Sequence, residues 1–214
     1  LKNFTVPSLL DYKKKIYDFH PQSFDSLALE LFYFQAQHNP TYRDYLKHLH
    51  VTASEIVSVS KIPFLPIEMF KIFEIKTENW NEQKRFLSSG TTSKMRSFHC
   101  IEDIKYYHDH TQKIYEEFYG DLTNSTIMAL LPSYLEQGDS GLISMIDSFI
   151  EQSSSAYSGY YLESFESLEK GLYSALKNNE QVILFGVTYA LVEFAKQAKN
   201  QFSDLIVVET GGMK

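Results

Sequence analysis

The stretch Val182-Ile183-Leu184-Phe185-Gly186-Val187-Thr188 decides the fold class of this 214-residue chain. Its four leading apolar residues predict a strand that is buried on both faces, and the glycine that follows predicts the strand's end. Ile127–Leu131 and Leu205–Val208 have the same character. Because helical patterns alternate with these runs, the sequence predicts an α/β fold with a mostly parallel sheet covered by helices.

The N-terminal part has a different pattern. Apolar residues recur at helical spacing over residues 8–19, over 23–38 and after Asn39-Pro40. Asp11 stands where a capping box led by Ser8 needs an acid. We therefore predict a helical N-terminal region over residues 1–57, followed by an α/β part over residues 58–214.

Between these parts, Lys61–Lys71 carries two prolines three residues apart. Its apolar neighbours favour a packed connector over a Pro-x-x-Pro ligand for another domain. Short strands are expected at Phe73–Lys76 and Lys84–Leu87, with Met95–Cys100 as the hairpin partner of the latter.

Composition limits the possible functions. The net charge is −7 without a long basic run, which argues against nucleic acid as the main partner. Cys100 is the single cysteine, so an internal disulfide is impossible, and it is expected to be a buried structural thiol in a reducing compartment. No run has the length of a membrane span and no signal-peptide pattern opens the chain, so we expect a cytoplasmic protein without a membrane span.

The hairpin loop is the first candidate site. Ser88-Ser89-Gly90-Thr91-Thr92-Ser93-Lys94 offers hydroxyls, backbone N–H groups and one mobile cation, which together suit the oxygens of a phosphate. It is not a Walker A loop, because no second glycine directly precedes the lysine. An ordinary solvated loop has the same composition, so both interpretations stay open.

A second candidate site lies at the carboxyl ends of the predicted parallel strands. Ser133-Tyr134, Gly186–Thr188 and Glu209–Gly212 follow three of these strands. Ligands of open α/β sheets bind at such ends, although strand ends are polar in any case. The pairs His48/His50 and His108/His110 are two residues apart on predicted helices, where they point to different faces, so no metal site is expected there.

Four segments in order resemble one family: Ile62–Pro66, Ser88–Lys94, Leu130–Glu136 and Glu209–Lys214. They resemble the acyl-protein synthetases (LuxE-like) within the adenylate-forming acyl- and aryl-CoA ligase superfamily. Ser93 and Met95 depart from the glycine and proline that are usual in the wider superfamily. The resemblance implies that the chain corresponds to the N-terminal half of such an enzyme.

For the site residues, the resemblance implies the following roles. Ser88, Ser89, Gly90, Thr91, Thr92, Ser93 and Lys94 would hold the β- and γ-phosphates of ATP, with Mg²⁺ as the expected metal and no dedicated metal ligand in this chain. Gly211 and Gly212 would lie against the adenine. Ser133, Tyr134 and Thr188 would border the acyl pocket or the reaction centre, with Lys94 and Thr188 as catalytic candidates.

The implied function is ATP-dependent activation of a fatty acid, or of another carboxylic acid, as its acyl-adenylate, with transfer to a protein thiol. Two alternatives remain open at this point. One is an acyl- or aryl-CoA ligase, with coenzyme A as the acceptor. The other is a non-catalytic fragment that binds a nucleotide or an acyl group, because the later part of the family's site is not in this chain.

Overall fold

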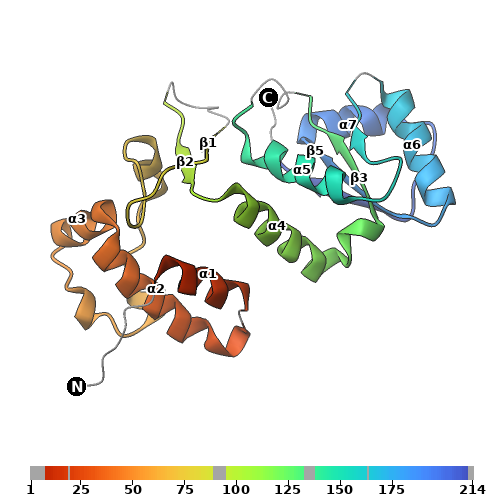
Figure 1. Ribbon diagram of the computed structural model, residues 1–214. Helices are drawn as coiled ribbons and strands as arrows, with labels where there is room; N and C mark the ends of the chain where they lie inside the picture. Colours follow the sequence, from red (N-terminus) through yellow and green to blue (C-terminus); the bar gives the residue numbers. More distant parts are fainter. Residues whose placement is uncertain (1–7, 19, 89–94, 133–137, 163, 212–214) are drawn as a thin grey trace. The chain divides into compact units, whose positions relative to one another are not determined.

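The computed structural model describes residues 8–18, 20–88, 95–132, 138–162 and 164–211 (Figure 1). The chain forms two compact units, Leu1–Asp103 and Ile104–Lys214, which are taken in turn below. The boundary expected between residues 57 and 58 stays a prediction.

The first unit combines three helices with a two-stranded hairpin. Its elements are α1 (Leu9–Tyr17), α2 (Phe24–His38), α3 (Pro40–His48), β1 (Lys84–Leu87) and β2 (Phe98–Ile101). The predicted capping box of α1 is present, with Ser8 and Asp11 bonding each other's backbone. Asn39 caps α3 by accepting from the backbone N–H of Tyr42 at 3.0 Å. β1 and β2 pair antiparallel with Leu87 opposite Phe98, which confirms the predicted hairpin.

Tyrosine hydroxyls tie the connector Lys61–Lys71, and the segment just before it, to the helices. Tyr33 donates to the carbonyl of Ile56 at 2.6 Å. Tyr42 and Tyr45 donate to the carbonyls of Pro63 and Phe64 at 2.8 and 3.3 Å. The connector is therefore packed, as predicted, but only in part.

The connector's apolar residues divide between two environments. Ile62 and Leu65 pack against the small core of Phe32, Tyr42 and Leu46. Phe64 and Ile67, by contrast, are each 73% exposed.

The strand predicted at Phe73–Lys76 is wrong. The segment follows the 3₁₀ helix Ile67–Lys71 and pairs with no strand among the described residues. The neighbouring strand β1 pairs with β2 instead. The charged side chains of Glu74 and Lys76 enter ion pairs instead.

The second unit is a parallel α/β structure. Its elements are α4 (Ile104–Tyr119), β3 (Ser125–Leu130), α5 (Gly141–Gln152), β4 (Gly159–Tyr160), α6 (Phe165–Lys177), β5 (Gln181–Gly186), α7 (Thr188–Gln197) and β6 (Leu205–Glu209). The strand order is β4-β3-β5-β6, and all three pairings are parallel. The predicted α/β class with a parallel sheet is thus confirmed.

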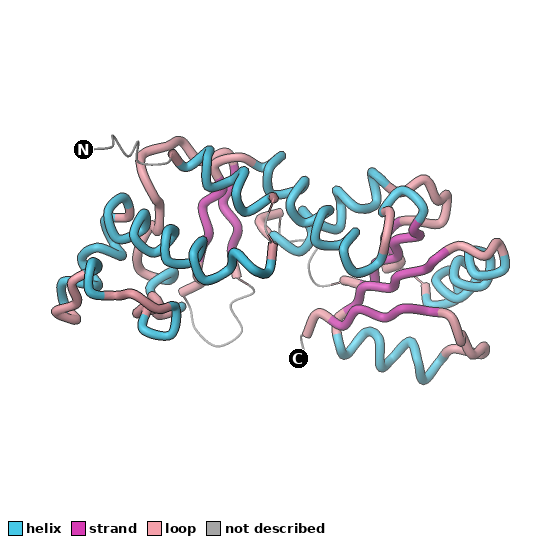
Figure 2. The backbone as a smooth tube through the Cα atoms, turned by 90° about the horizontal axis from the view of Figure 1, so that it is seen from below, coloured by secondary structure: helices cyan, strands magenta, loops and turns pink. Residues whose placement is uncertain are grey.

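Helices lie on both faces of this sheet. α5 lies on one face and α7 on the opposite face (Figure 2). Every residue of β3 is buried, and Val182, Ile183 and Leu184 of β5 are at most 1% exposed. Burial on two faces explains why these strands read as continuous apolar runs. β4, which pairs with β3, is only two residues long.

A polar cluster lies at the amino ends of β3 and β5. Thr126 and Ser155 both donate to the same carboxylate oxygen of Glu180, and the Ser155 bond is 2.5 Å. Ser153 donates to the carbonyl of Ser125 at 2.6 Å. These bonds satisfy the buried hydroxyls that interrupt the apolar pattern, so the cluster is structural.

Among the helices of the described residues, none is both long and apolar enough to cross a bilayer.

Candidate functional site at the strand ends of the second unit

The carboxyl ends of β5 and β6 are joined by backbone hydrogen bonds. The N–H of Thr210 donates to the carbonyl of Gly186 at 3.0 Å, and the Thr210 hydroxyl donates to the same oxygen at 3.2 Å. The N–H of Thr188 donates to the carbonyl of Gly211 at 3.3 Å. Two segments that the sequence separates by more than twenty residues therefore meet at one sheet edge.

A carboxylate fixes this junction. Oε1 of Glu209 accepts from the hydroxyl of Thr188 and from the N–H of Gly211, the latter at 3.0 Å. Thr188 is the first residue of α7, where backbone N–H groups and the helix dipole favour negative charge. The side chain of Thr188 is thus held in one orientation by a charged acceptor.

Two glycines are needed here for different reasons. Gly211 has φ +78°, which L side chains rarely adopt, while the space around it is open because an added Cβ would meet nothing within 4 Å. At Gly186 an added Cβ would lie 2.6 Å from Leu191, so glycine lets α7 pack closely on β5. At Gly211 it is therefore the backbone conformation that favours glycine.

The other predicted site residues are placed only in part. Ser88 lies in the first unit, where its N–H donates to the carbonyl of Ser97 at 2.9 Å and its Oγ accepts from the N–H of Ser97 at 3.1 Å. It therefore extends the β1–β2 hairpin to the edge of the loop. The remaining predicted residues lie outside the described residues: Ser89, Gly90, Thr91, Thr92, Ser93, Lys94, Ser133, Tyr134 and Gly212.

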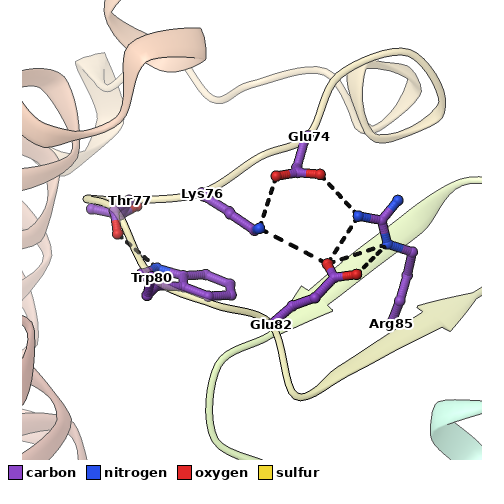
Figure 3. Close-up of polar contacts among 6 residues, drawn as sticks. All are labelled: Glu74, Lys76, Thr77, Trp80, Glu82 and Arg85. Atoms are coloured by element: carbon purple, nitrogen blue, oxygen red, sulfur yellow. Dashed lines mark hydrogen bonds and ion pairs between the residues drawn. The ribbon is translucent and has the colours of Figure 1, made fainter.

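The first unit holds a charged cluster that the sequence did not reveal (Figure 3). Arg85 grips Glu82 through two nitrogens at 2.9 and 3.0 Å and reaches Glu74 at 2.8 Å. Lys76 pairs with Glu74 at 2.8 Å. The two cations hold the pKa of both carboxyl groups below the ordinary value. The bonds from Arg85 are the main cause at Glu82, and the bond from Lys76 is the main cause at Glu74.

Glu74, Glu82 and Cys100 also have ligand atoms within 4.8 Å of one another, a spacing that suits a metal. The charges argue against one. Arg85 and Lys76 neutralise both carboxylates. Burial is the main reason, and the bond to Glu82 the second reason, that the pKa of the Cys100 thiol is raised to about 11. A neutral thiol is a poor metal ligand.

Three histidines of the two pairs have contacts of their own. Nδ1 of His48 contacts the carbonyl of Asp44 at 2.7 Å. Nε2 of His108 lies 2.9 Å from Oγ of Ser144 and links α4 to α5, whereas the His110 ring stacks on Tyr106 at 5.9 Å. His48, His108 and His110 therefore contact three different partners.

No protein-family model matches this chain, and a search of curated proteins also finds no match.

Proposed function

We propose that this chain supplies part of the nucleotide site of an ATP-dependent acyl-activating enzyme of the acyl-protein synthetase type. The observation that carries the proposal is the junction of Thr188 with Glu209–Gly211 at the carboxyl ends of two parallel strands. Ligands of open parallel sheets bind at this edge. Two of the four segments on which the resemblance rests begin at the last residue of a strand that ends at this edge. They are Leu130–Glu136, which begins at the end of β3, and Glu209–Lys214, which begins at the end of β6.

The chain's residues would position rather than transfer protons. ATP and Mg²⁺ would supply an electrophilic phosphorus with neutralised oxygens. An oxygen of the substrate carboxylate then bonds to the α-phosphorus, and the bond to pyrophosphate breaks, which leaves the acyl-adenylate. Ser88–Lys94 would hold the departing phosphates, and Lys94 would compensate their charge.

At the sheet edge, Gly211 and Gly212 would face the adenine. The hydroxyl of Thr188 donates its only proton to Glu209, so Thr188 would act by holding Glu209 and the turn after β6 in place beside the reacting groups. Ser133 and Tyr134 would border the acyl chain. The donors of the α7 N-terminus would favour the negative charge that gathers there.

The acyl acceptor would be a thiol of the protein's own later part, of a partner protein or of coenzyme A. Cys100 does not suit this role, because it is 6% exposed and its pKa is raised to about 11, so little thiolate forms near neutral pH. An ATP-consuming enzyme with one reduced cysteine fits the cytoplasm.

Calorimetric binding of a non-hydrolysable ATP analogue that keeps the β- and γ-phosphates, with Mg²⁺ present, tests the proposal. We expect the wild type to bind, and both Gly90→Val, which crowds the loop, and Lys94→Ala, which removes its charge, to weaken binding by about tenfold or more. Gly138→Val and Lys177→Ala make the same chemical changes elsewhere and should bind as the wild type does. Equal binding by all five proteins would contradict the assigned role of the loop.

A further inference from the structure

The first unit holds an open cavity of about 580 Å³, and no residue of the strand-end site lines it. Its walls come from α1, α2, α3, the connector with Val59 before it, the segment before β1, and β2. Apolar side chains form most of the surface, among them Leu31, Phe32, Ile62, Phe70 and Trp80. A volume of this size is typical of small-molecule sites in proteins.

The polar groups of the wall bond to the protein itself. Gln35 accepts from Thr77 and from Asn39, the latter at 3.3 Å. The hydroxyl of Tyr42 donates to the connector carbonyl of Pro63 at 2.8 Å. Nε1 of Trp80 donates to the carbonyl of Thr77 at 2.9 Å. The donors of Thr77, Asn39, Tyr42 and Trp80 are thus committed, and the cavity presents mainly apolar surface.

The wall also lacks charge. None of the described residues that line the cavity is Lys, Arg, Asp or Glu. Partial burial lowers the pKa of His99, so its ring is neutral at neutral pH. A carboxylate or ammonium inside would lose its hydration without gaining a counter-ion.

From these observations we infer that the first unit binds an uncharged, largely apolar small molecule in this cavity. The inference does not depend on the proposed acyl-activating function, since no residue of the strand-end site contributes to the wall. Aromatic rings of Phe32, Phe70 and Trp80 give the wall flat surfaces that suit an aromatic or extended aliphatic ligand.

Trp80 makes the inference testable, because it is the single tryptophan of the chain and lies in the wall. The full chain is titrated with N-phenyl-1-naphthylamine, an uncharged fluorescent probe, while Trp80 is excited. Saturable energy transfer from Trp80 to the probe is the expected result. Its absence up to the solubility limit of the probe would overturn the inference.

Displacement of the bound probe tests the charge preference on the wild type alone. At pH 8, 1-decanol is expected to displace the probe at about tenfold lower concentration than decanoate, which has the same chain and a negative head. Equal or stronger displacement by decanoate would overturn the assignment to uncharged ligands.

A cavity-filling variant tests the location. Ala28 lies on α2 in the wall, and Ala28→Phe places a ring in the cavity, so we expect probe affinity to fall about tenfold or more. Gln37→Phe adds the same ring to an exposed position of α2 and should leave affinity unchanged. Far-UV circular dichroism establishes that both variants fold. Unchanged affinity in a folded Ala28→Phe protein would overturn the location.

Discussion

The hydroxyl of Thr126 offers a prediction that separates a hydrogen bond from simple packing. Thr126 is fully buried and donates to the Glu180 carboxylate at the amino end of the sheet. Thr126→Val removes this donor and keeps the shape. A bond to a charged group contributes about 1.5–3 kcal/mol, and the added methyl returns about 0.8 kcal/mol. Since Glu180 is only half-buried, we expect a net cost near the lower limit, about 1 kcal/mol.

Hydrogen exchange of the β3 and β5 amides measures this cost. About 1 kcal/mol corresponds to roughly fivefold faster exchange at pH 7. Thr126→Ser keeps the hydroxyl and loses a buried methyl, so it is expected to cost a similar amount for a different reason. At one pH the two variants look alike, and the pH dependence distinguishes them.

The sign of that dependence follows from Glu180. Burial alone would raise its pKa, but the bonds from Ser155, Thr126 and Asn178 together lower it below the ordinary value of 4.5. Its stabilisation is therefore complete above that value and is lost as the pH falls further. The effect of Thr126→Val should fade toward pH 4 and below, whereas that of Thr126→Ser should persist. A pH-independent effect of Thr126→Val would refute the reasoning.

Three further outcomes are expected. Gly211→Ala places a side chain at φ +78°, which costs about 1–2 kcal/mol and speeds β6 amide exchange, while Gly138→Ala, at a position without positive φ, should leave β6 unchanged. Arg85→Met should loosen the β1–β2 hairpin more than Arg85→Lys, because only the guanidinium grips Glu82 through two nitrogens, and proteolysis of the hairpin reports this. Cys100, with its pKa raised to about 11, should react with iodoacetamide at pH 8 about a hundredfold more slowly than an ordinary thiol, and unfolding in urea should remove the difference.

Sequence periodicity predicted the second unit well because burial is encoded locally. Continuous apolar runs at β3 and β5 indicated strands that are buried on both faces, and the structure has them there. The strand predicted at Phe73–Lys76 is wrong because strand pairing, unlike burial, is not encoded locally. A strand needs a partner, and the identity of partners is a property of the whole fold rather than of four residues.

The candidate site was predictable only in its parts. Parallel pairing places the ends of β5 and β6 together, so Thr188 and Gly211 could be expected to lie close. The bond of both residues to one oxygen of Glu209 depends on the turn after β6 and left no local signal. The charged cluster around Arg85 joins β1 to the irregular segment before it, and the apolar cavity is built from segments far apart in the chain, so spacing rules within one element predict neither.

The tyrosine bonds to the connector have a consequence for how this region can change over evolutionary time. Tyr33, Tyr42 and Tyr45 grip carbonyl oxygens, which every amino acid possesses. Exposed connector positions outside the cavity, such as Ile67, can therefore vary among many residues without loosening the attachment. In related chains we expect the anchoring phenols to persist while the side chains of the segment they hold diverge.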